Sequence, residues 1–196
     1  FPYTTLFRSE EIQQKENLSE ESQANMLTAM KNVDTLLRLT TNLINFSKAN
    51  VYSSSLRISE HELNTYMEGI CHAFYSYAEA KQIKLDYKSN FEYQNVWFDK
   101  EKMDSITKNL ISNAIKYTPA HGEVHIIICH DKDNWSLEIT DTGIGIPAKE
   151  QKKLFKLHFR GSNAINAKIT GSGIGLMLVW KLVRIHKGKI SIESVE

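Results

Sequence analysis

The sequence predicts an α+β fold in which helices cover one face of a mixed β-sheet, with one long helix before it. Beyond residue 55, stretches that alternate like strands are interspersed with three stretches of helical periodicity. Before residue 51, one long stretch shows only helical periodicity. We therefore expect a layer of helices on a sheet, and a different kind of structure towards the N-terminus.

The long helix is predicted between residues 17 and 52. Ser19 is the expected N-cap, because acidic residues follow it in the first turn. No glycine or proline interrupts residues 22–50, and apolar positions recur at spacings of three and four. Such a wide apolar face needs more than one neighbouring helix, which favours a bundle helix over the alternative, a core helix of the following domain. Residues 1–16 have no clear period and are expected to be a disordered or foreign leader.

A domain is predicted from residue 56 to residue 196, after a linker at residues 51–55. Ser59 and Asp99 are the expected N-caps of its first two helices. Strands are predicted at residues 56–58, 83–87, 95–98, 123–130, 134–140 and 189–194. Helices are predicted at residues 60–80, 100–117, 148–155 and 174–186.

The composition narrows the class of protein. The chain has 196 residues, of which 41% are hydrophobic and 24% charged, as in an ordinary globular protein. The net charge of +1 gives no strong attraction to nucleic acid or to a membrane surface. Cys71 and Cys129 form no paired motif, which indicates a reduced, cytoplasmic setting and no structural zinc. No apolar run is long enough to span a bilayer, so any membrane anchor would lie in segments absent from this chain.

The loop that begins at Asp141 has features of a ligand site. It follows a predicted strand, and its carboxylate could accept a hydrogen bond from an exocyclic amine. Gly143 and Gly145 would let a flat ligand approach the main chain. The alternative is an ordinary turn.

A polar stripe on the helix at 100–117 is a second candidate. Asn109, Asn113 and Lys116 are spaced by four and three residues, so they share one face of the helix. Asparagine is a poor residue in the middle of a helix. A Mg²⁺ ion with phosphate oxygens would account for it, because amide carbonyls are hard oxygen ligands. A solvated polar edge is the alternative.

Two further stretches complete the pattern. Gly171, Gly173 and Gly175 alternate at the start of the last helix, where exposed N–H groups and the helix dipole favour phosphate; a flexible hinge is the alternative. Between the two glycine loops, Arg160 could reach a terminal phosphate, and residues 162–167 have the small, polar composition of a mobile lid. A plain surface loop is the alternative for this stretch.

The order of these pieces strongly resembles the N, G1, F and G2 boxes of sensor histidine kinases, members of the gyrase–Hsp90–kinase–MutL (GHKL) ATPase superfamily. The boxes read Asn-x-x-x-Asn-x-x-Lys-Tyr, Asp-x-Gly-x-Gly, Phe-x-x-x-Phe-Arg and Gly-x-Gly-x-Gly-Leu. The resemblance covers residues 56–196, and the helix at 17–52 is similar to the second helix of the family's dimerisation and phosphotransfer bundle. It is closest to hybrid two-component sensors of the Bacteroides type.

The resemblance implies a Bergerat-type two-layer α/β sandwich that binds ATP and Mg²⁺, with a role for each box residue. Asp141 would hold the adenine amine beside Gly143 and Gly145, and Tyr117 would stack near the base. Asn109 and Asn113 would coordinate Mg²⁺, while Lys116 and Arg160 would neutralise phosphate charge. The phosphate cradle would comprise Gly171, Ser172, Gly173, Gly175 and Leu176.

The implied reaction is transfer of the γ-phosphoryl group to a histidine, then to an aspartate of a response-regulator receiver domain. The resemblance also implies a homodimer through the bundle helix and a cytoplasmic domain of an inner-membrane sensor. Position 109 favours phosphotransfer over hydrolysis, since the hydrolytic relatives have a glutamate there. A GHKL-type ATP hydrolase, or a nucleotide-binding or dimerisation module without autonomous activity, are the alternatives.

Two departures from the family pattern affect these expectations. His61-Glu62 looks like the start of a phosphoacceptor motif, but it lacks the basic residue and the proline that follow. We expect His61 to be a helix-surface histidine, so that the acceptor is absent from this chain and the fragment does not phosphorylate itself. The family's sheet also has one more strand after the segment that ends at Glu196.

Overall fold

The computed structural model describes most of residues 55–196 and part of the preceding helix. The described residues are 24–33, 35–36, 55–131, 134–156, 161–167 and 173–196, with single residues at 19, 22, 40, 159 and 169. The chain divides into two units, Phe1–Lys48 and Ala49–Glu196.

In the first unit, the described residues between 22 and 40 are helical. The backbone N–H of Ser22 donates to Oγ of Ser19 at 3.3 Å, which confirms Ser19 as the cap. Leu27 and Leu36 of this helix are exposed. The bundle assignment stays a prediction, and the leader expected at residues 1–16 lies outside the described residues.

The second unit contains a mixed sheet, as predicted. Its elements are β1 (Ile58–Glu62), α3 (Leu63–Ala80), β2 (Lys84–Ser89), β3 (Asn95–Asp99), α4 (Lys100–Tyr117), β4 (Glu123–Asp131), β5 (Asn134–Asp141), α5 (Ala148–Gln151), α6 (Ser162–Asn166) and α7 (Gly175–Ile185). Strand β2 pairs with β4 in parallel, and β4 pairs with β5 antiparallel. Strands β1 and β3 form a separate antiparallel pair.

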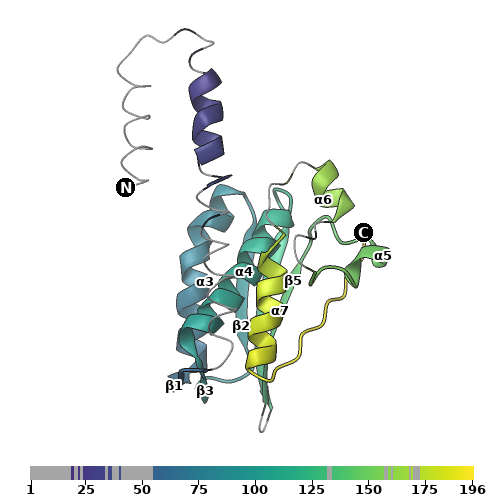
Figure 1. Ribbon diagram of the computed structural model, residues 1–196. Coiled ribbons are helices and arrows are strands. Elements are labelled where there is room, and N and C mark those ends of the chain that lie inside the picture. Colours follow the sequence, from purple (N-terminus) through teal and green to yellow (C-terminus); the bar gives the residue numbers. More distant parts are fainter. Residues whose placement is uncertain are drawn as a thin grey trace. The chain divides into compact units, whose positions relative to one another are not determined.

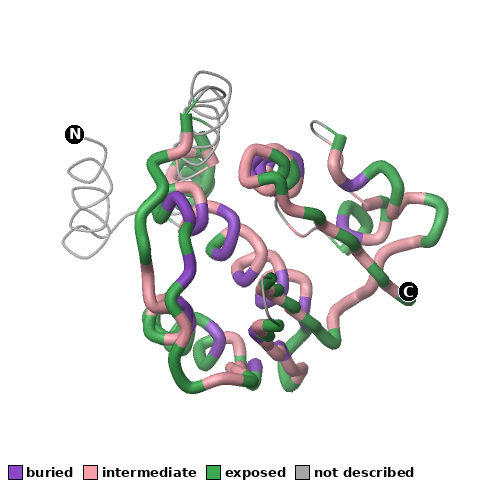
Figure 2. The backbone as a smooth tube through the Cα atoms, turned by 90° about the horizontal axis from the view of Figure 1, so that it is seen from below, coloured by how far each residue is buried: buried purple, intermediate pink, exposed green. Residues whose placement is uncertain are grey.

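Helices α3, α4 and α7 lie side by side on one face of the β2–β4–β5 sheet (Figure 1). The side chains of Val124, Ile126 and Ile128 alternate along β4 and are fully buried beneath them. Ile111 of α4 and Val179 of α7 are equally buried. In Figure 2 the buried stretches of the tube accordingly gather between the helices and the sheet. The result is the two-layer α+β arrangement that the sequence predicted.

The start of α3 differs from the prediction, which placed a cap at Ser59. Strand β1 continues to Glu62, because the whole of residues 58–62 pairs with β3. Glu62 is the N-cap: its carboxylate accepts from the N–H groups of Asn64 at 3.1 Å and Thr65 at 2.6 Å. It also accepts from Gln94 at 3.1 Å. Although burial alone would raise the pKa of Glu62, these hydrogen bonds, led by those of Thr65, hold it at about 2.

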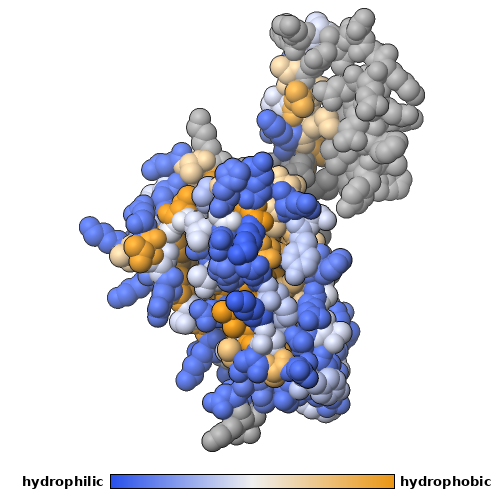
Figure 3. Space-filling model, turned by 180° about the vertical axis from the view of Figure 1, so that it is seen from behind, coloured by the Kyte–Doolittle hydropathy of each residue, from blue (hydrophilic) through white to orange (hydrophobic). Residues whose placement is uncertain are grey.

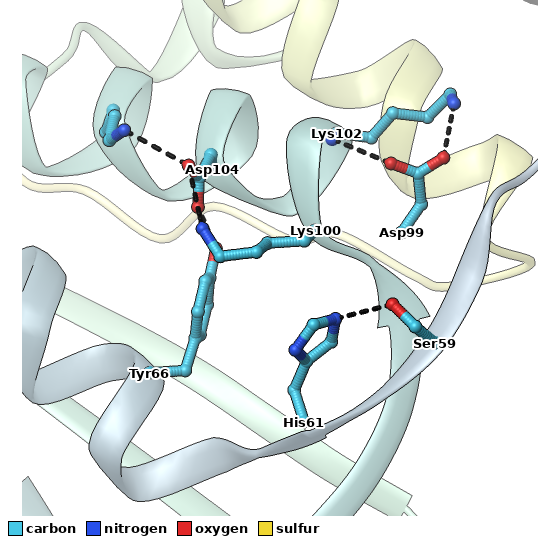
Figure 4. Close-up of polar contacts among 8 residues, drawn as sticks. Ser59, His61, Tyr66, Asp99, Lys100, Lys102 and Asp104 are labelled. Carbon is cyan, nitrogen blue, oxygen red and sulfur yellow. Dashed lines mark hydrogen bonds and ion pairs between the residues drawn. The ribbon is translucent and has the colours of Figure 1, made fainter.

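The prediction of a helix-surface position for His61 is wrong, because His61 lies on β1. One of its ring nitrogens, Nε2, is 2.8 Å from Oγ of Ser59 (Figure 4). The centre of its ring lies 4.8 Å from that of the Phe98 ring. Phe98 is almost fully buried. These contacts give His61 a structural role at the edge of the core.

The C-terminal part also differs. The strand predicted at residues 189–194 is absent, since residues 188–196 pair with no strand. Instead the carbonyl of Ser194 accepts a hydrogen bond from Nε2 of Gln151 at 2.7 Å. Helix α5 ends at Gln151, not at Phe155, and α6 lies in the stretch expected to be a loop. The structure of this part involves side-chain contacts between segments distant in the sequence, such as those of Gln151 with Ser194 and of Glu150 with Ser162. A local sequence pattern does not predict such contacts.

The outer face of the sheet is polar, as Figure 3 shows from the side opposite to the helices. Nζ of Lys84 lies 3.2 Å from the carboxylate of Asp86, and Nε2 of His125 lies 2.9 Å from that of Glu123. Cys129 is exposed on this face, whereas burial raises the pKa of Cys71, on α3, to about 12. The outer face of the sheet is therefore exposed to solvent. The hydrophobic core lies on the opposite face, beneath the helices.

Candidate nucleotide-binding site

The C-terminal half of α4 presents the predicted polar stripe. Asn109, Asn113 and Lys116 are all half-buried, while the opposite face of the helix carries the fully buried Ile111 and Ile115. Nδ2 of Asn109 donates to the carbonyl of Ser105 at 2.7 Å. This hydrogen bond satisfies the amide nitrogen within the helix and leaves the amide oxygen directed elsewhere.

The first turn of α7 lies directly beside these asparagines. A Cβ atom placed on Gly175 would be 2.8 Å from Oδ1 of Asn109 and 4.0 Å from Nδ2 of Asn113. A side chain at position 175 would therefore require the Asn109 amide to move, and glycine lets α7 begin this close to α4 without that shift. Gly173 has a φ of 69°, in the left-handed region. No side chain of the described residues caps the N-terminus of α7, so its N–H groups are suited to an anion.

The loop after β5 is attached to the end of α4. The N–H of Ile144 donates to the carbonyl of Tyr117 at 3.2 Å. A Cβ atom on Gly143 would lie 2.8 Å from that same carbonyl oxygen, so this glycine permits the contact. Gly145 has a φ of 64°, and a side chain there would collide with the carbonyl of Val195. Both glycines are thus required by close approach of the chain's own backbone, and their predicted role in admitting a flat ligand stays a prediction.

Asp141 stands at the end of β5, at the edge of this loop. Its Oδ1 accepts the N–H of Gly143 at 2.9 Å. The residue is exposed overall, but nearby protein removes enough water from the carboxylate to raise its pKa, against the opposing effect of the Gly143 N–H. The carboxylate is therefore a stronger acceptor of a ligand proton than a fully solvated one.

Positive charge gathers at the C-terminal end of α4. Nζ of Lys116 lies 4.9 Å from the centre of the Tyr117 ring. Nζ of Lys81 donates to the carbonyls of Ile115 at 3.0 Å and of Lys116 at 3.2 Å, so it caps the helix from α3. The role of Lys81 could not be predicted, because nothing in its local sequence marks a partner 35 residues away.

The structure therefore brings together three of the sequence motifs. Asn109, Asn113, Lys116 and Tyr117 come from α4, Asp141, Gly143 and Gly145 from the loop after β5, and Gly173, Gly175 and Leu176 from the start of α7. Arg160, Gly171 and Ser172 lie outside the described residues.

The residues present fit a magnesium nucleotide. The two asparagine amides offer neutral oxygen ligands, and α7 begins beside them with the positive end of its dipole. Within the described ranges, no group of three or more His, Cys, Asp and Glu side chains could hold a metal ion. Such a site suits Mg²⁺ whose remaining ligands are phosphate oxygens and water, since this ion is rarely enclosed by protein ligands alone.

Comparison with known proteins supports the same conclusion. Residues 98–196 match the family described as histidine kinase-, DNA gyrase B- and HSP90-like ATPase. The chain is 29% identical over 171 residues to the circadian input-output histidine kinase CikA of Synechocystis sp., which covers 86% of this chain and 23% of that protein. It is 31% identical over 168 residues to the adaptive-response sensory kinase SasA of Rippkaea orientalis, covering 85% and 42%. The chain thus spans less than half the length of these relatives.

Solved structures show the same fold. Full-length ShkA in complex with AMPPNP superposes with a TM-score of 0.70 at 18% identity, covering 94% of this chain and 41% of that one. Histidine kinase ThkA in complex with the response regulator TrrA has a TM-score of 0.62 at 22% identity, covering 86% and 50%. At this level of identity the likeness concerns the fold.

The fold and the three assembled motifs define a nucleotide-binding α+β protein. The chain belongs to the histidine kinase-, DNA gyrase B- and HSP90-like ATPase family. Its relatives are sensor histidine kinases, and it corresponds to their ATP-binding catalytic region. In the part of the chain that the structure describes, no helix is both long and apolar enough to cross a membrane.

Proposed function

We propose that this chain binds ATP with Mg²⁺ and presents the γ-phosphoryl group for transfer to a histidine side chain. The observation that carries the proposal is the position of Gly175 against Asn109, which places the start of α7 beside the asparagine stripe. Phosphate binding at a helix N-terminus and magnesium binding at asparagine oxygens then occur at one place.

In this proposal each described residue has a limited task. Asn109 and Asn113 hold Mg²⁺, which would neutralise the charge that develops on the phosphates. Lys116 adds positive charge, the N–H groups of Gly173 and Gly175 contact phosphate oxygens, and Asp141 accepts a hydrogen bond from the adenine amine. Catalysis is then positioning and charge neutralisation. Arg160, Gly171 and Ser172 complete the proposed set.

The residue at position 109 bears on the choice between phosphotransfer and hydrolysis. Asn109 cannot act as a general base, because its amide does not accept a proton at ordinary pH. Its amide nitrogen is moreover held by Ser105. The site therefore lacks a base for water at this position and favours transfer to a histidine nucleophile, which needs no such base.

The relatives support proposals for the rest of the pathway. ThkA forms a complex with the response regulator TrrA, so we propose that a receiver domain is the final acceptor here too. Dimerisation through the helix at 17–52, a cytoplasmic position in a membrane-bound sensor and a hybrid architecture of the Bacteroides type are proposed on the same basis. The boundaries at residues 52 and 56 are part of this proposal.

A nucleotide titration tests the proposed function. Calorimetry with ATP should show binding by this chain that is strengthened by Mg²⁺ and lost in Asp141→Asn. Ser136→Ala, at an exposed position earlier on β5, should bind like the parent chain. Absence of ATP binding would refute the proposal, and steady release of phosphate without a phosphoprotein would favour an ATP hydrolase.

A further inference from the structure

Two side-chain amides hold three successive carbonyls of the loop after β5. Nδ2 of Asn163 donates to the carbonyl oxygens of Ile144 at 3.2 Å and of Gly145 at 2.8 Å. Nε2 of Gln151 donates to the carbonyl of Ile146 at 3.1 Å. The loop's backbone oxygens are therefore bound by donors from α5 and α6, which lie on the same side of the molecule in Figure 1.

The donor on α6 is itself held in place. Oδ1 of Asn163 accepts the N–H of Ala164 at 2.9 Å, which fixes the amide with its nitrogen towards the loop. Ala164 is buried, at 6% exposure, and so fixes the helix that carries Asn163. The carboxylate of Glu150 accepts the N–H of Ser162 at 2.9 Å and joins α5 to α6. The two amide donors thus belong to one connected support.

The loop needs such support because of its conformation. Gly145 adopts a positive φ of 64°, and glycine loses more conformational freedom on ordering than any other residue. The same short loop begins with Asp141, whose Oδ1 is bound to the N–H of Gly143. A change in the backbone at residues 144–146 would therefore change the direction of the Asp141 carboxylate.

We propose that Asn163 and Gln151 are positioning residues that hold the loop in the shape by which Asp141 selects adenine. The proposal rests on the nucleotide site proposed above and adds to it the residues that determine base preference. The amide nitrogens of both residues contact backbone carbonyls of the loop after β5, and neither residue belongs to the proposed phosphate or Mg²⁺ set, so we expect their effect to fall on discrimination between bases.

The substitution Asn163→Asp tests this with little change in size. It replaces the amide donor by an oxygen that faces two carbonyl oxygens, so the contact becomes repulsive. Asn166→Asp is the matched control, because Asn166 lies on the same helix, undergoes the same chemical change and is exposed. Gln151→Glu tests the second donor independently, and circular dichroism verifies that each variant is folded.

The measurement is the ratio of affinities for ATP and ITP, obtained by displacement of a fluorescent ATP analogue. Inosine lacks the exocyclic amine, so the ratio reports the Asp141 contact and not phosphate binding. We expect the parent and Asn166→Asp to prefer ATP by about tenfold, and Asn163→Asp to lose most of this preference through weaker ATP binding. Gln151→Glu should also reduce the preference for ATP over ITP.

Four outcomes would overturn the proposal. Equal loss of ATP and ITP affinity in Asn163→Asp would assign Asn163 a merely structural role, and an unchanged ratio in both variants would show that the loop holds its shape without them. A parent chain that binds neither nucleotide would refute the nucleotide site itself. If the parent chain bound ATP and ITP with equal affinity, the proposed nucleotide site would be supported, but selection of adenine by Asp141 would be refuted.

Discussion

The two ends of α4 use polar residues in opposite ways. At the N-terminal end, Asp99 is only 2% exposed, and its carboxylate accepts a hydrogen bond from the backbone N–H of Arg57 at 2.9 Å. It also accepts a hydrogen bond from Nζ of Lys102 (Figure 4). At the C-terminal end, Asn109 and Asn113 are half-buried and face the start of α7. The N-terminal end satisfies its polar groups within the protein, whereas in the function proposed above the asparagine oxygens at the C-terminal end bind a ligand.

The N-terminal end is a closed network. The N–H of Asp99 donates to Nε2 of His186 at 3.4 Å, which connects the end of β3 to the end of α7. Nearby, the hydroxyl of Tyr66 donates a hydrogen bond to Asp104 at 2.8 Å. Burial, and to a smaller extent this hydrogen bond, raises the pKa of Tyr66. Although burial alone would raise the pKa of Asp99, hydrogen bonds led by that of Lys102 hold it below its ordinary value. Such an arrangement stabilises the fold and leaves no group for chemistry.

The largest expected effect comes from breaking this network. Asp99→Ala removes the cap of α4 and the carboxylate that pairs with the Lys102 ammonium, whose side chain is 12% exposed, so we expect a loss of about 3–4 kcal/mol in the free energy of unfolding. Urea denaturation measures it. Lys100→Ala is the control, because the exposed pair that Lys100 forms with Asp104 is worth at most about 0.5 kcal/mol. A loss below about 1 kcal/mol in Asp99→Ala would contradict the assignment.

The opposite end should respond in the opposite sense. Asn113→Ala should lower the affinity for ATP with Mg²⁺ by about 100-fold, through loss of a metal ligand. The same change should raise stability by about 0.5 kcal/mol, because alanine is the better helix residue. Calorimetry and urea denaturation measure the two effects. Ser112→Ala, one residue off the stripe, should keep the affinity of the parent, and a joint loss of stability and affinity would mark Asn113 as structural.

The smallest effect concerns pH. The raised pKa of Asp141 means that its carboxylate takes up a proton at a higher pH than an ordinary aspartate. As the pH falls through that raised pKa, the acceptor for the adenine amine is lost, so ATP affinity should fall by up to about tenfold on acidification, and at a higher pH than an ordinary aspartate would give. ITP binding, measured in parallel by calorimetry, should lack this additional decrease. Equal pH dependence for the two nucleotides would contradict the role of Asp141.

The sequence was sufficient for what depends on local pattern. The cap at Asp99, the alternation along β4 and the asparagine stripe are all properties of nearby residues, and the structure contains each of them. It was insufficient where distant segments compete. Glu62 is the cap in place of Ser59, because residues 58–62 pair with β3 and the Glu62 carboxylate also accepts the N–H of Gln94. Residues 189–194 form no strand, and the carbonyl of Ser194 instead accepts a hydrogen bond from Gln151.

The same limit applies to the site. That the described box residues lie together could be predicted, because their order along the chain resembles that of a known family; their roles stay predictions. Lys81, Gln151 and Asn163 were not, because each acts through backbone carbonyls that any sequence would supply. A side chain that binds backbone leaves no trace in its partner's residue type, so only the folded arrangement reveals it.

The contrast between the two cysteines provides a chemical handle for these experiments. Cys129 is exposed on the outer face of the sheet, whereas Cys71 lies on the buried face of α3, has a pKa of about 12 and is therefore almost entirely protonated at neutral pH. A maleimide dye should modify Cys129 alone in the folded protein. A reporter can thus be attached to the unaltered chain on the face opposite to the helices, where it leaves the asparagine stripe and the glycine turns untouched.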